Sequence, residues 1–392
     1  MNLLDTHILE NWYQTNFESQ IKGRRILFND IEPLIKKLSN KFKKEILGYS
    51  ENNIPIYKIS IGTGSIKILS WSQMHGNEST GTKALFDLFN FFENSGDLES
   101  IKDQILKQCM LQFIVLLNPD GAINFTRENA NNIDLNRDAY NLSQPESILL
   151  RQTFDEFKPD FCYNLHDQRT IYGAGDSGKV ATVSFLAPSF NENRDINEAR
   201  SKAMNIIVAM NDELQRHIPN KVGRFDDAYN GNCVGDTFQQ LNVPTILFEA
   251  GHFENDYYRE YTRKMIFIAL LSGLMFICEN DIVSNEFEDY LKIPQNKINF
   301  YDFIYRNVKI NYDNKEFITN FAAQYMEELI EGKIQFNAYI AEIGELKGFY
   351  GHFQYNAHKM LYADDEDSIP KIDKKASFYI GKDIKIVNGI RI

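Results

Sequence analysis

The chain has 392 residues, of which 43% are hydrophobic, and 54 acidic against 42 basic residues give a formal net charge of −12. This length and apolar content suffice for a large core and a second small domain. The acidic balance excludes nucleic acid as a partner, because phosphate backbones require a basic surface. The four cysteines include no Cys-x-x-Cys pair, so we interpret them as core residues and not as a disulfide framework.

No segment of the sequence predicts export or membrane insertion. Residues 1–17 lack a basic stretch followed by an apolar core, so no signal peptide is expected. The longest apolar stretch, residues 265–278, is short for a membrane span and predicts a buried helix. We therefore expect a cytoplasmic protein with no membrane partner, whose oligomeric state the sequence leaves open.

Strand and helix patterns alternate over the first 280 residues. Residues 1–43 form a predicted helical N-terminal segment. Strands are predicted at residues 45–47, 55–61, 66–71, 111–117, 161–165, 180–186 and 245–249. Helices are predicted at residues 80–92, 144–157, 193–217 and 258–279. This alternation predicts an α/β fold with a mixed sheet and helices on both of its faces.

The pattern changes near residue 285. Short, aromatic-rich alternating runs follow at residues 299–310, 315–325, 333–343 and 376–386, with Asn-Gly and Gly-Lys turns nearby. We therefore predict two domains, an α/β domain over residues 1–284 and a small all-β domain over residues 285–392.

Chemically active side chains follow or end four of the predicted strands. In open α/β sheets, functional sites collect at the carboxyl ends of the strands, so these side chains are expected at one edge of the sheet. In chain order they are His75, Glu78, Arg127, Asn136, Arg137, His166 and Glu249.

These residue types suit metal-assisted hydrolysis of an amide. His75, Glu78 and His166 would hold one Zn²⁺ and leave a position for water. Glu249 would be the general base that takes the water proton and later gives it to the leaving amine. Arg127 would polarise the scissile carbonyl and stabilise the developing oxyanion.

A second arginine would select the substrate. Arg137 offers a planar guanidinium fork that matches a carboxylate with two hydrogen bonds, which lysine cannot do. Asn136 stands beside it in the sequence. The pair predicts a clamp for a free carboxylate next to the scissile bond.

A set of short motifs, in one order over most of residues 45–280, resembles the zinc carboxypeptidase family of metallopeptidases. The motifs are His75-x-x-Glu78, Asn118-Pro-Asp-Gly121, Arg127, Asp134-Leu-Asn-Arg137, Asn164-Leu-His166 and Phe248-Glu249. The resemblance implies a zinc exopeptidase fold. It matches the zinc ligands, the carbonyl-polarising arginine, the carboxylate anchor and the catalytic glutamate to the residues assigned above.

The sequence departs from the family after Asn136-Arg137, where it reads Asp138-Ala139-Tyr140. Tyr229 is the nearest match to the family's mobile tyrosine, which closes over the substrate and precedes the catalytic glutamate by about twenty residues. Asp236 falls where the family lines its side-chain specificity pocket, and an acidic residue there favours a basic side chain.

Two other functions fit part of the pattern. The aspartoacylase and succinylglutamate desuccinylase group shares the zinc scaffold and a C-terminal β domain, and its substrate would be an N-acyl amino acid instead of a short peptide. The spacing from Asn118 to Arg127 favours the carboxypeptidases, whereas residues 285–392 and the missing signal peptide favour the deacylases. A non-catalytic binding protein is the third candidate, but it would not need Glu249 as a base.

Simpler roles compete for several residues. Arg127 and Arg137 are alternatively surface cations paired with Glu128 and Asp138. Asp167 either orients an imidazole or caps a turn. His252 is interpreted as hydrogen-bonding to a site residue or having no role. The glycine-rich residues 173–178 lack a P-loop ending and are expected to form a flexible rim of the active site.

Overall fold

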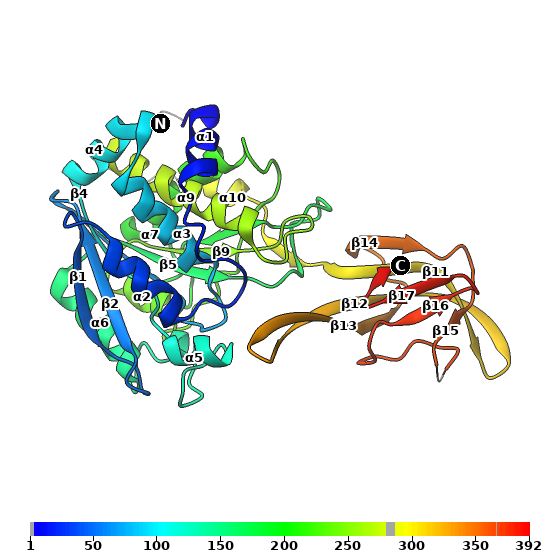
Figure 1. Cartoon of the computed structure of the whole chain (residues 1–392). Helices are drawn as coiled ribbons and strands as arrows, with labels where there is room; N and C mark the ends of the chain where they lie inside the picture. The colour runs from blue at the N-terminus through cyan, green and yellow to red at the C-terminus, as the bar shows by residue number, and fades with distance from the viewer. Residues whose placement is uncertain (1–3, 280–286, 366) are drawn as a thin grey trace. The chain divides into compact units, whose positions relative to one another are not determined.

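The computed structural model describes residues 4–279, 287–365 and 367–392 (Figure 1). It divides into two compact units: the first contains residues up to Gln168 and Ala181–Asn296, and the second contains Arg169–Val180 and Lys297–Ile392. The boundary predicted at residues 284 and 285 lies outside the described residues. The second unit also takes a twelve-residue segment from the middle of the chain, which the sequence pattern did not indicate.

An eight-stranded mixed sheet forms the centre of the first unit, in the order β1-β2-β4-β3-β5-β9-β7-β8 (Figure 1). The strands are β1 Lys43–Tyr49, β2 Pro55–Ile61, β3 Ile66–Ser72, β4 Cys109–Ile114, β5 Phe161–Asp167, β7 Val183–Leu186, β8 Val222–Arg224 and β9 Thr245–Ala250. The central strands β4, β3, β5 and β9 run parallel, so their carboxyl ends meet at one edge. The predicted mixed α/β fold is confirmed.

Helices cover both faces of this sheet. The larger core joins one face to α1 Thr6–Asn16, α2 Phe28–Lys37, α3 Thr80–Glu93, α4 Glu99–Gln108, α7 Glu198–Leu214, α9 Glu260–Glu279 and α10 Glu288–Lys292. The smaller core joins the opposite face to α6 Pro145–Phe157 and α8 Val234–Gln240. Side chains of β5 point alternately into the two cores: Tyr163 and Leu165 lie in the larger core and Cys162 lies in the smaller one.

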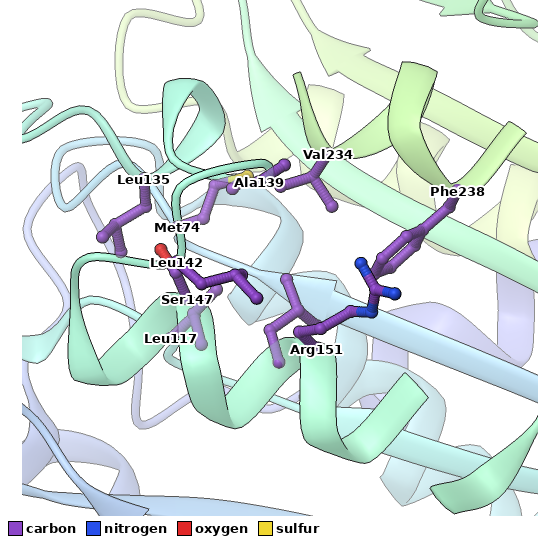
Figure 2. A pocket seen from close by; sticks show the side chains of 10 residues that line it. Met74, Leu117, Leu135, Ala139, Leu142, Ser147, Arg151, Val234 and Phe238 are labelled. Atoms are coloured by element: carbon purple, nitrogen blue, oxygen red, sulfur yellow. The ribbon is translucent and has the colours of Figure 1, made fainter. Parts of the chain in front are cut away.

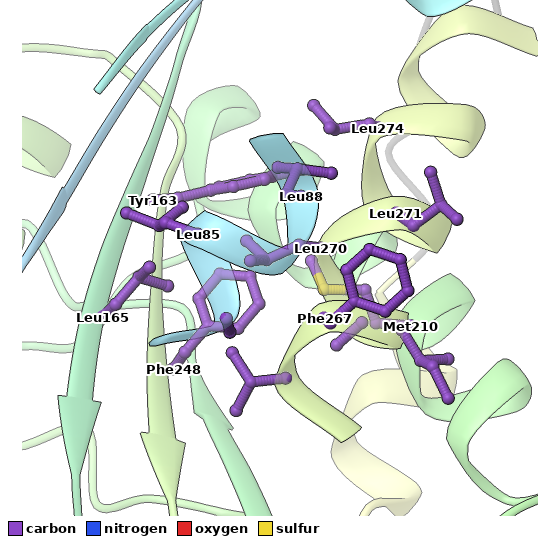
Figure 3. Close-up of a cluster of buried hydrophobic side chains, with 14 of the residues drawn as sticks. Leu85, Leu88, Tyr163, Leu165, Met210, Phe248, Phe267, Leu270, Leu271 and Leu274 are labelled. Atoms are coloured by element: carbon purple, nitrogen blue, oxygen red, sulfur yellow. The ribbon is translucent and has the colours of Figure 1, made fainter. Parts of the chain in front are cut away.

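The larger core is centred on α9 (Figure 3). Phe267, Leu270 and Leu271 of this helix pack near Leu85 and Leu88 of α3. By length and composition, α9 is apolar enough to cross a membrane, which is weak evidence because core helices pass the same test. Of its most apolar window, 83% is buried inside the protein. It is thus the buried helix that the sequence predicts.

Asn118-Pro-Asp-Gly121 starts a short helix, α5 Pro119–Asn124. The Oδ1 atom of Asn118 accepts a hydrogen bond from the backbone N–H of Gly121 at 2.8 Å. Proline at the first helical position lacks only an N–H that would have no partner there. The four residues therefore cap and begin a helix.

The second unit contains two four-stranded sheets, in the orders β13-β12-β11-β14 and β15-β16-β17-β18. The strands are β11 Phe300–Tyr312, β12 Lys315–Ile330, β13 Lys333–Gly344, β14 Tyr350–Asn356, β15 Tyr362–Ala363, β16 Phe378–Ile380, β17 Ile384–Val387 and β18 Ile390–Arg391. Phe303, Tyr305, Phe321 and Phe378 contribute to one buried core. Strand β14 was not predicted, and it pairs with β11 in parallel.

The glycine-rich residues 173–178 belong to the second unit, and their expected role as a rim of the active site stays a prediction. Its strand β6, Tyr172–Ala174, pairs with β10, Asn296–Ile298. Asn299 Nδ2 donates to the carbonyl of Gly175, and His352 Nε2 lies 2.8 Å from the carbonyl oxygen of Thr170. Backbone pairing and these contacts hold the segment against residues that follow it by more than 120 positions.

Candidate active site

The carboxyl ends of β3 and β5 bring two histidines and a glutamate together. The Nδ1 atom of His75 lies 2.9 Å from Glu78 Oε1, and the Nδ1 atom of His166 lies 2.8 Å from Glu78 Oε2. The two Nδ1 atoms are 3.1 Å apart. Two imidazole nitrogens and a carboxylate that face one point form a donor set that zinc accepts.

The loop after β3 is supported from α5. Its backbone approaches that helix so closely that a Cβ atom on Gly76 would lie 2.0 Å from the carbonyl carbon of Gly121. Asn118 Nδ2 donates to the carbonyl of Met74 at 3.1 Å. Position 76 therefore requires glycine, and the Asn-Pro-Asp-Gly motif places the ligands although it contributes no ligand itself.

Asp134 fixes the orientation of the first imidazole. Its Oδ1 atom lies 3.0 Å from His75 Nε2, and its Oδ2 atom accepts a hydrogen bond from Arg127 Nε at 2.9 Å. A carboxylate on the far nitrogen leaves Nδ1 of His75 for a metal ion. We assigned no role to Asp134 from the sequence, although its place in Asp134-Leu-Asn-Arg137 was the available signal.

The pKa values of the three candidate ligands are shifted by their mutual charges and by burial, in a way that suits a bound cation. Burial favours the neutral acid, yet the imidazoles of His75 and His166 hold the pKa of Glu78 well below its ordinary value. Burial lowers the pKa of His166. Burial also opposes protonation of His75, but Glu78 and Asp134 outweigh it and raise the pKa of His75. A buried carboxylate that stays ionised between imidazoles fits a zinc ion.

Glu249 lies on the strand next to the one that carries His166. It pairs with His166 in the register between the parallel strands β5 and β9. Its side chain is buried, and Oε2 has no hydrogen-bond partner among the described residues. Burial, followed by the charges of Glu78 and Asp167, raises the pKa of Glu249 well above its ordinary value. Such a carboxylate suits proton transfer near neutral pH.

Arg127 reaches toward the candidate ligands from the loop after α5. Its Nη1 atom lies 3.2 Å from His75 Nδ1 and 3.5 Å from Glu78 Oε1. The side chain is 40% exposed, so a substrate can approach it. Asp134 is its partner, and the alternative surface pair with Glu128 is not the one that the structure contains.

The predicted carboxylate clamp lies in a single 3₁₀ turn, Leu135–Arg137. Asn136 accepts the backbone N–H of Val234 at 3.0 Å through Oδ1, which keeps its amide NH₂ as a donor group. Arg137 is exposed and donates to the carbonyl of Asn136 at 2.8 Å. Val234 begins α8, so this hydrogen bond ties the clamp to that helix.

Asp236 lies in the first turn of α8, and the positive charge of Arg137 acts on its carboxyl group. Burial raises its pKa to about 7, and Arg137 partly opposes that rise. Its Oδ1 atom accepts the backbone N–H of Asn230 at 3.2 Å. Tyr229, in the same loop, is half-buried with its hydroxyl beside Gly231, and no contact joins it to the candidate ligands among the described residues.

An apolar pocket lies behind the clamp turn (Figure 2). Met74 and Leu135, each next to a site residue, face Val234 and Phe238 of α8 across it. Its cavity volume of about 10 Å³ has room for about one water molecule. The pocket therefore supports the clamp and does not accommodate a substrate side chain.

One simpler prediction needs correction. The carboxylate of Asp167 makes no hydrogen bond or ion pair with an imidazole or a turn among the described residues; its Oδ2 atom pairs with Arg24 Nη1 at 2.5 Å and accepts from Thr80 Oγ1 at 2.7 Å. Arg24 lies in a segment for which no chemical role was predicted. His252 packs its ring 4.6 Å from that of Tyr257.

Known proteins resemble part of this chain. The family model described as zinc carboxypeptidase matches residues 29–171. Carboxypeptidase SOL1 of Arabidopsis thaliana is 29% identical over 139 residues, covering 30% of this chain and 28% of the relative. Carboxypeptidase 2 of Trichophyton rubrum is 31% identical over 108 residues, covering 26% of this chain and 19% of that relative. The chain thus spans less than a third of these curated relatives.

Solved structures share the fold. A carboxypeptidase A-like protein of Shewanella denitrificans aligns with a TM-score of 0.54 at 16% identity, over 64% of this chain and 69% of that one. A metallo-carboxypeptidase of Pseudomonas aeruginosa aligns with a TM-score of 0.51 at 15% identity, over 65% of this chain and 70% of that one. Together with the family match over residues 29–171, these likenesses confirm the resemblance of this chain to the zinc carboxypeptidase family.

Proposed function

We propose that the protein is a zinc metallocarboxypeptidase that removes the C-terminal residue of short peptides and holds one zinc ion per chain. The observation that carries this proposal is the convergence of His75, Glu78 and His166 beside the buried carboxylate of Glu249. The family match supports an enzyme of this class. The cytoplasmic location expected from the sequence stays a prediction.

Each residue has a distinct part in the proposed reaction. Bound zinc would lower the pKa of a water molecule and polarise the scissile carbonyl. Glu249 takes the proton of that water and delivers it to the leaving nitrogen. Arg127, whose Nη1 points at the ligands, donates to the carbonyl oxygen as negative charge develops there.

The clamp selects a substrate that has a free carboxylate next to the scissile amide. Arg137 and the NH₂ group of Asn136 donate to that carboxylate. Tyr229 closes over the bound residue in this proposal. An N-acyl amino acid would use the same clamp, but the comparisons favour a carboxypeptidase and therefore a peptide substrate.

Asp236 makes a basic leaving residue the preferred one. It lies within the electrostatic reach of Arg137, at the helix that holds Asn136. The Pseudomonas metallo-carboxypeptidase was solved in complex with (2-guanidinoethylmercapto)succinic acid, which joins a guanidino group to a dicarboxylic acid. A lysine or arginine with a free carboxylate offers this protein the same two kinds of group.

Paired peptides test the proposal. The zinc-loaded protein is given peptides that differ only in a free or an amidated C-terminus, and released amino acid is measured. We expect release from the free form only, faster for C-terminal lysine or arginine than for phenylalanine. Arg137→Ala should lower kcat/KM by about 10²-fold, the effect of losing a charged bidentate contact, whereas Lys36→Ala, at an exposed lysine of α2, should change it little. Equal cleavage of both forms, or cleavage of acyl-aspartate or acyl-glutamate alone, would contradict the proposal.

A further inference from the structure

Residues 21–27, here called the N-terminal strap, are bound to both sides of the metal-ligand loop. Ser79 Oγ donates to the carbonyl of Arg24 at 2.6 Å, and Gln73 Nε2 donates to the carbonyl of Ile26 at 2.9 Å. Gln73 Nε2 also donates to the carbonyl of Gly76 at 2.9 Å. Ser79 and Gln73 are fully buried and flank the four residues from His75 to Glu78, so the strap fixes both ends of that loop.

The side chain of Arg24 extends the strap to the second ligand strand. Its Nη1 atom lies 2.5 Å from Asp167 Oδ2 and 3.2 Å from Thr80 Oγ1. The arginine and aspartate side chains are 5% and 2% exposed, so the ion pair is shielded from water. Thr80 Oγ1 donates to the same carboxylate oxygen at 2.7 Å, which closes a triangle of buried polar groups.

Asp167 connects this triangle to the ligands. Its backbone N–H donates to Glu78 Oε2 at 3.1 Å, the same oxygen that lies 2.8 Å from His166 Nδ1. It also directly follows His166 in β5. Any movement of Asp167 therefore changes the position of one ligand through the chain and of another through a hydrogen bond.

We propose that Arg24 is a positioning residue for the metal site: by neutralising and fixing Asp167, it holds Glu78 and His166 in register with each other. The proposal rests on the proposed function, since it concerns the same zinc site. Arg24 lies outside residues 29–171, which the family model matches. Without the guanidinium, the Asp167 carboxylate is a buried charge that has lost its counter-ion, and it would move toward water or toward a cation.

A second buried ion pair provides the matched control. Arg263 of α9 and Asp87 of α3 are both 0% exposed and lie 2.5 Å apart. Arg263 also donates to the carbonyls of Ile21 and Glu18, so it too binds the N-terminal region. None of its hydrogen-bond and ion-pair partners, Asp87, Ile21, Glu18 and Glu260, is a candidate ligand. A purely structural role predicts the same behaviour for both arginines, whereas a positioning role separates them.

The experiment compares Arg24→Gln, Arg24→Lys and Arg263→Lys in the full chain. The zinc dissociation constant is measured by competition with a chromophoric chelator, stability by urea unfolding of the zinc-free protein, and kcat and KM on a peptide.

We expect Arg24→Gln to weaken zinc binding by about 10- to 100-fold, as loss of a group that orients ligands does, and to lower kcat more than it raises KM. Arg24→Lys should recover part of the zinc affinity. Arg263→Lys should lower stability but leave zinc affinity within about threefold.

The outcomes separate this proposal from the proposed function. If Arg24→Gln lowers stability but leaves zinc affinity unchanged, Arg24 is structural and the positioning role is wrong, whether or not the protein cleaves peptides. If Arg24→Gln weakens zinc binding but the wild type cleaves no peptide, Arg24 positions the site and the substrate assignment fails. Should Arg24→Gln not fold, Arg24→Lys decides, because zinc affinity equal to that of the wild type would contradict the proposal.

Discussion

Asp236 is the residue near the clamp whose charge changes close to neutral pH. Burial in the first turn of α8 raises its pKa to about 7, from an ordinary value of 3.8. A carboxyl group that is half protonated at neutral pH attracts a basic side chain more strongly as the pH rises. The preference for basic leaving residues should therefore increase between pH 6 and 8.

Asp236 also makes stability depend on pH. Because its folded pKa is raised, the folded state binds the proton more tightly, so this stabilisation is full below about pH 4 and is lost as the pH rises through about 7. Asp236→Asn cannot ionise and should be more stable than the wild type at pH 8, by on the order of 3–4 kcal/mol. Urea unfolding of both zinc-free proteins between pH 4 and 9 measures the difference. A difference that is constant over this range would contradict the burial argument.

At this scale, the sequence predicted the residues that stand at strand ends and missed their supports. His75, Glu78, His166 and Glu249 could be placed at one edge of the sheet because parallel strands deliver their carboxyl ends there. Arg24 was missed because its partner, Asp167, is 143 positions away and no spacing rule connects them. A contact of that separation depends on tertiary packing and leaves no local pattern.

Among contacts between elements, the buried ion pair between Asp87 of α3 and Arg263 of α9 is expected to affect the free energy of unfolding most. Asp87 also accepts from Tyr13 Oη at 2.9 Å and from the backbone N–H of Glu18 at 2.8 Å, so one carboxylate joins α1, α3 and α9. Hydrophobic patterning predicted α3 and α9 nearly to the residue. It did not predict α4, Glu99–Gln108, where only Lys102 and Ile105 are buried and the apolar signal is weak.

Removing that carboxylate should destabilise the protein strongly. Asp87→Ala leaves the guanidinium of Arg263 buried without its main counter-ion, and we expect a loss of about 3–5 kcal/mol in the free energy of unfolding. Asp155→Ala is the control, because it breaks the pair between Arg151 and an aspartate that is 54% exposed, which contributes about 1 kcal/mol or less. Chemical denaturation measures both. An Asp87→Ala protein as stable as the control would show that the pair contributes little.

For the whole molecule, the sequence predicted an α/β part and a β part but not how the chain is shared between them. The change in periodicity near residue 285 indicates the β part. Nothing in residues 169–180 indicates that this segment belongs there, because its contacts are with Asn299, Phe300 and His352. Strand β14 was missed for a related reason, since its parallel partner, β11, is not adjacent in sequence.

Zinc should stabilise only one of the two units. A ligand that binds the folded first unit raises its stability by RT ln(1 + [L]/Kd), about 2.7 kcal/mol when the free zinc concentration is 100 times Kd. Calorimetry should therefore show one transition that rises with zinc and another that does not. Gly389→Val should lower only the temperature of the transition that does not respond to zinc. At φ +84°, the Cβ of the new side chain would lie 2.4 Å from the ring of Phe303. A single transition that moves as a whole with zinc would contradict this prediction.

We propose that Glu249 transfers the proton in a zinc-dependent cleavage at a peptide C-terminus. Glu249→Gln keeps the size of the side chain and removes its basicity, so the direct measurement is kcat of this variant on a free C-terminal peptide, with its zinc content determined in the same sample. We expect kcat to fall by about 10²- to 10⁴-fold, with zinc still bound at one ion per chain. Cleavage by Glu249→Gln at the rate of the wild type would show that Glu249 is not the general base.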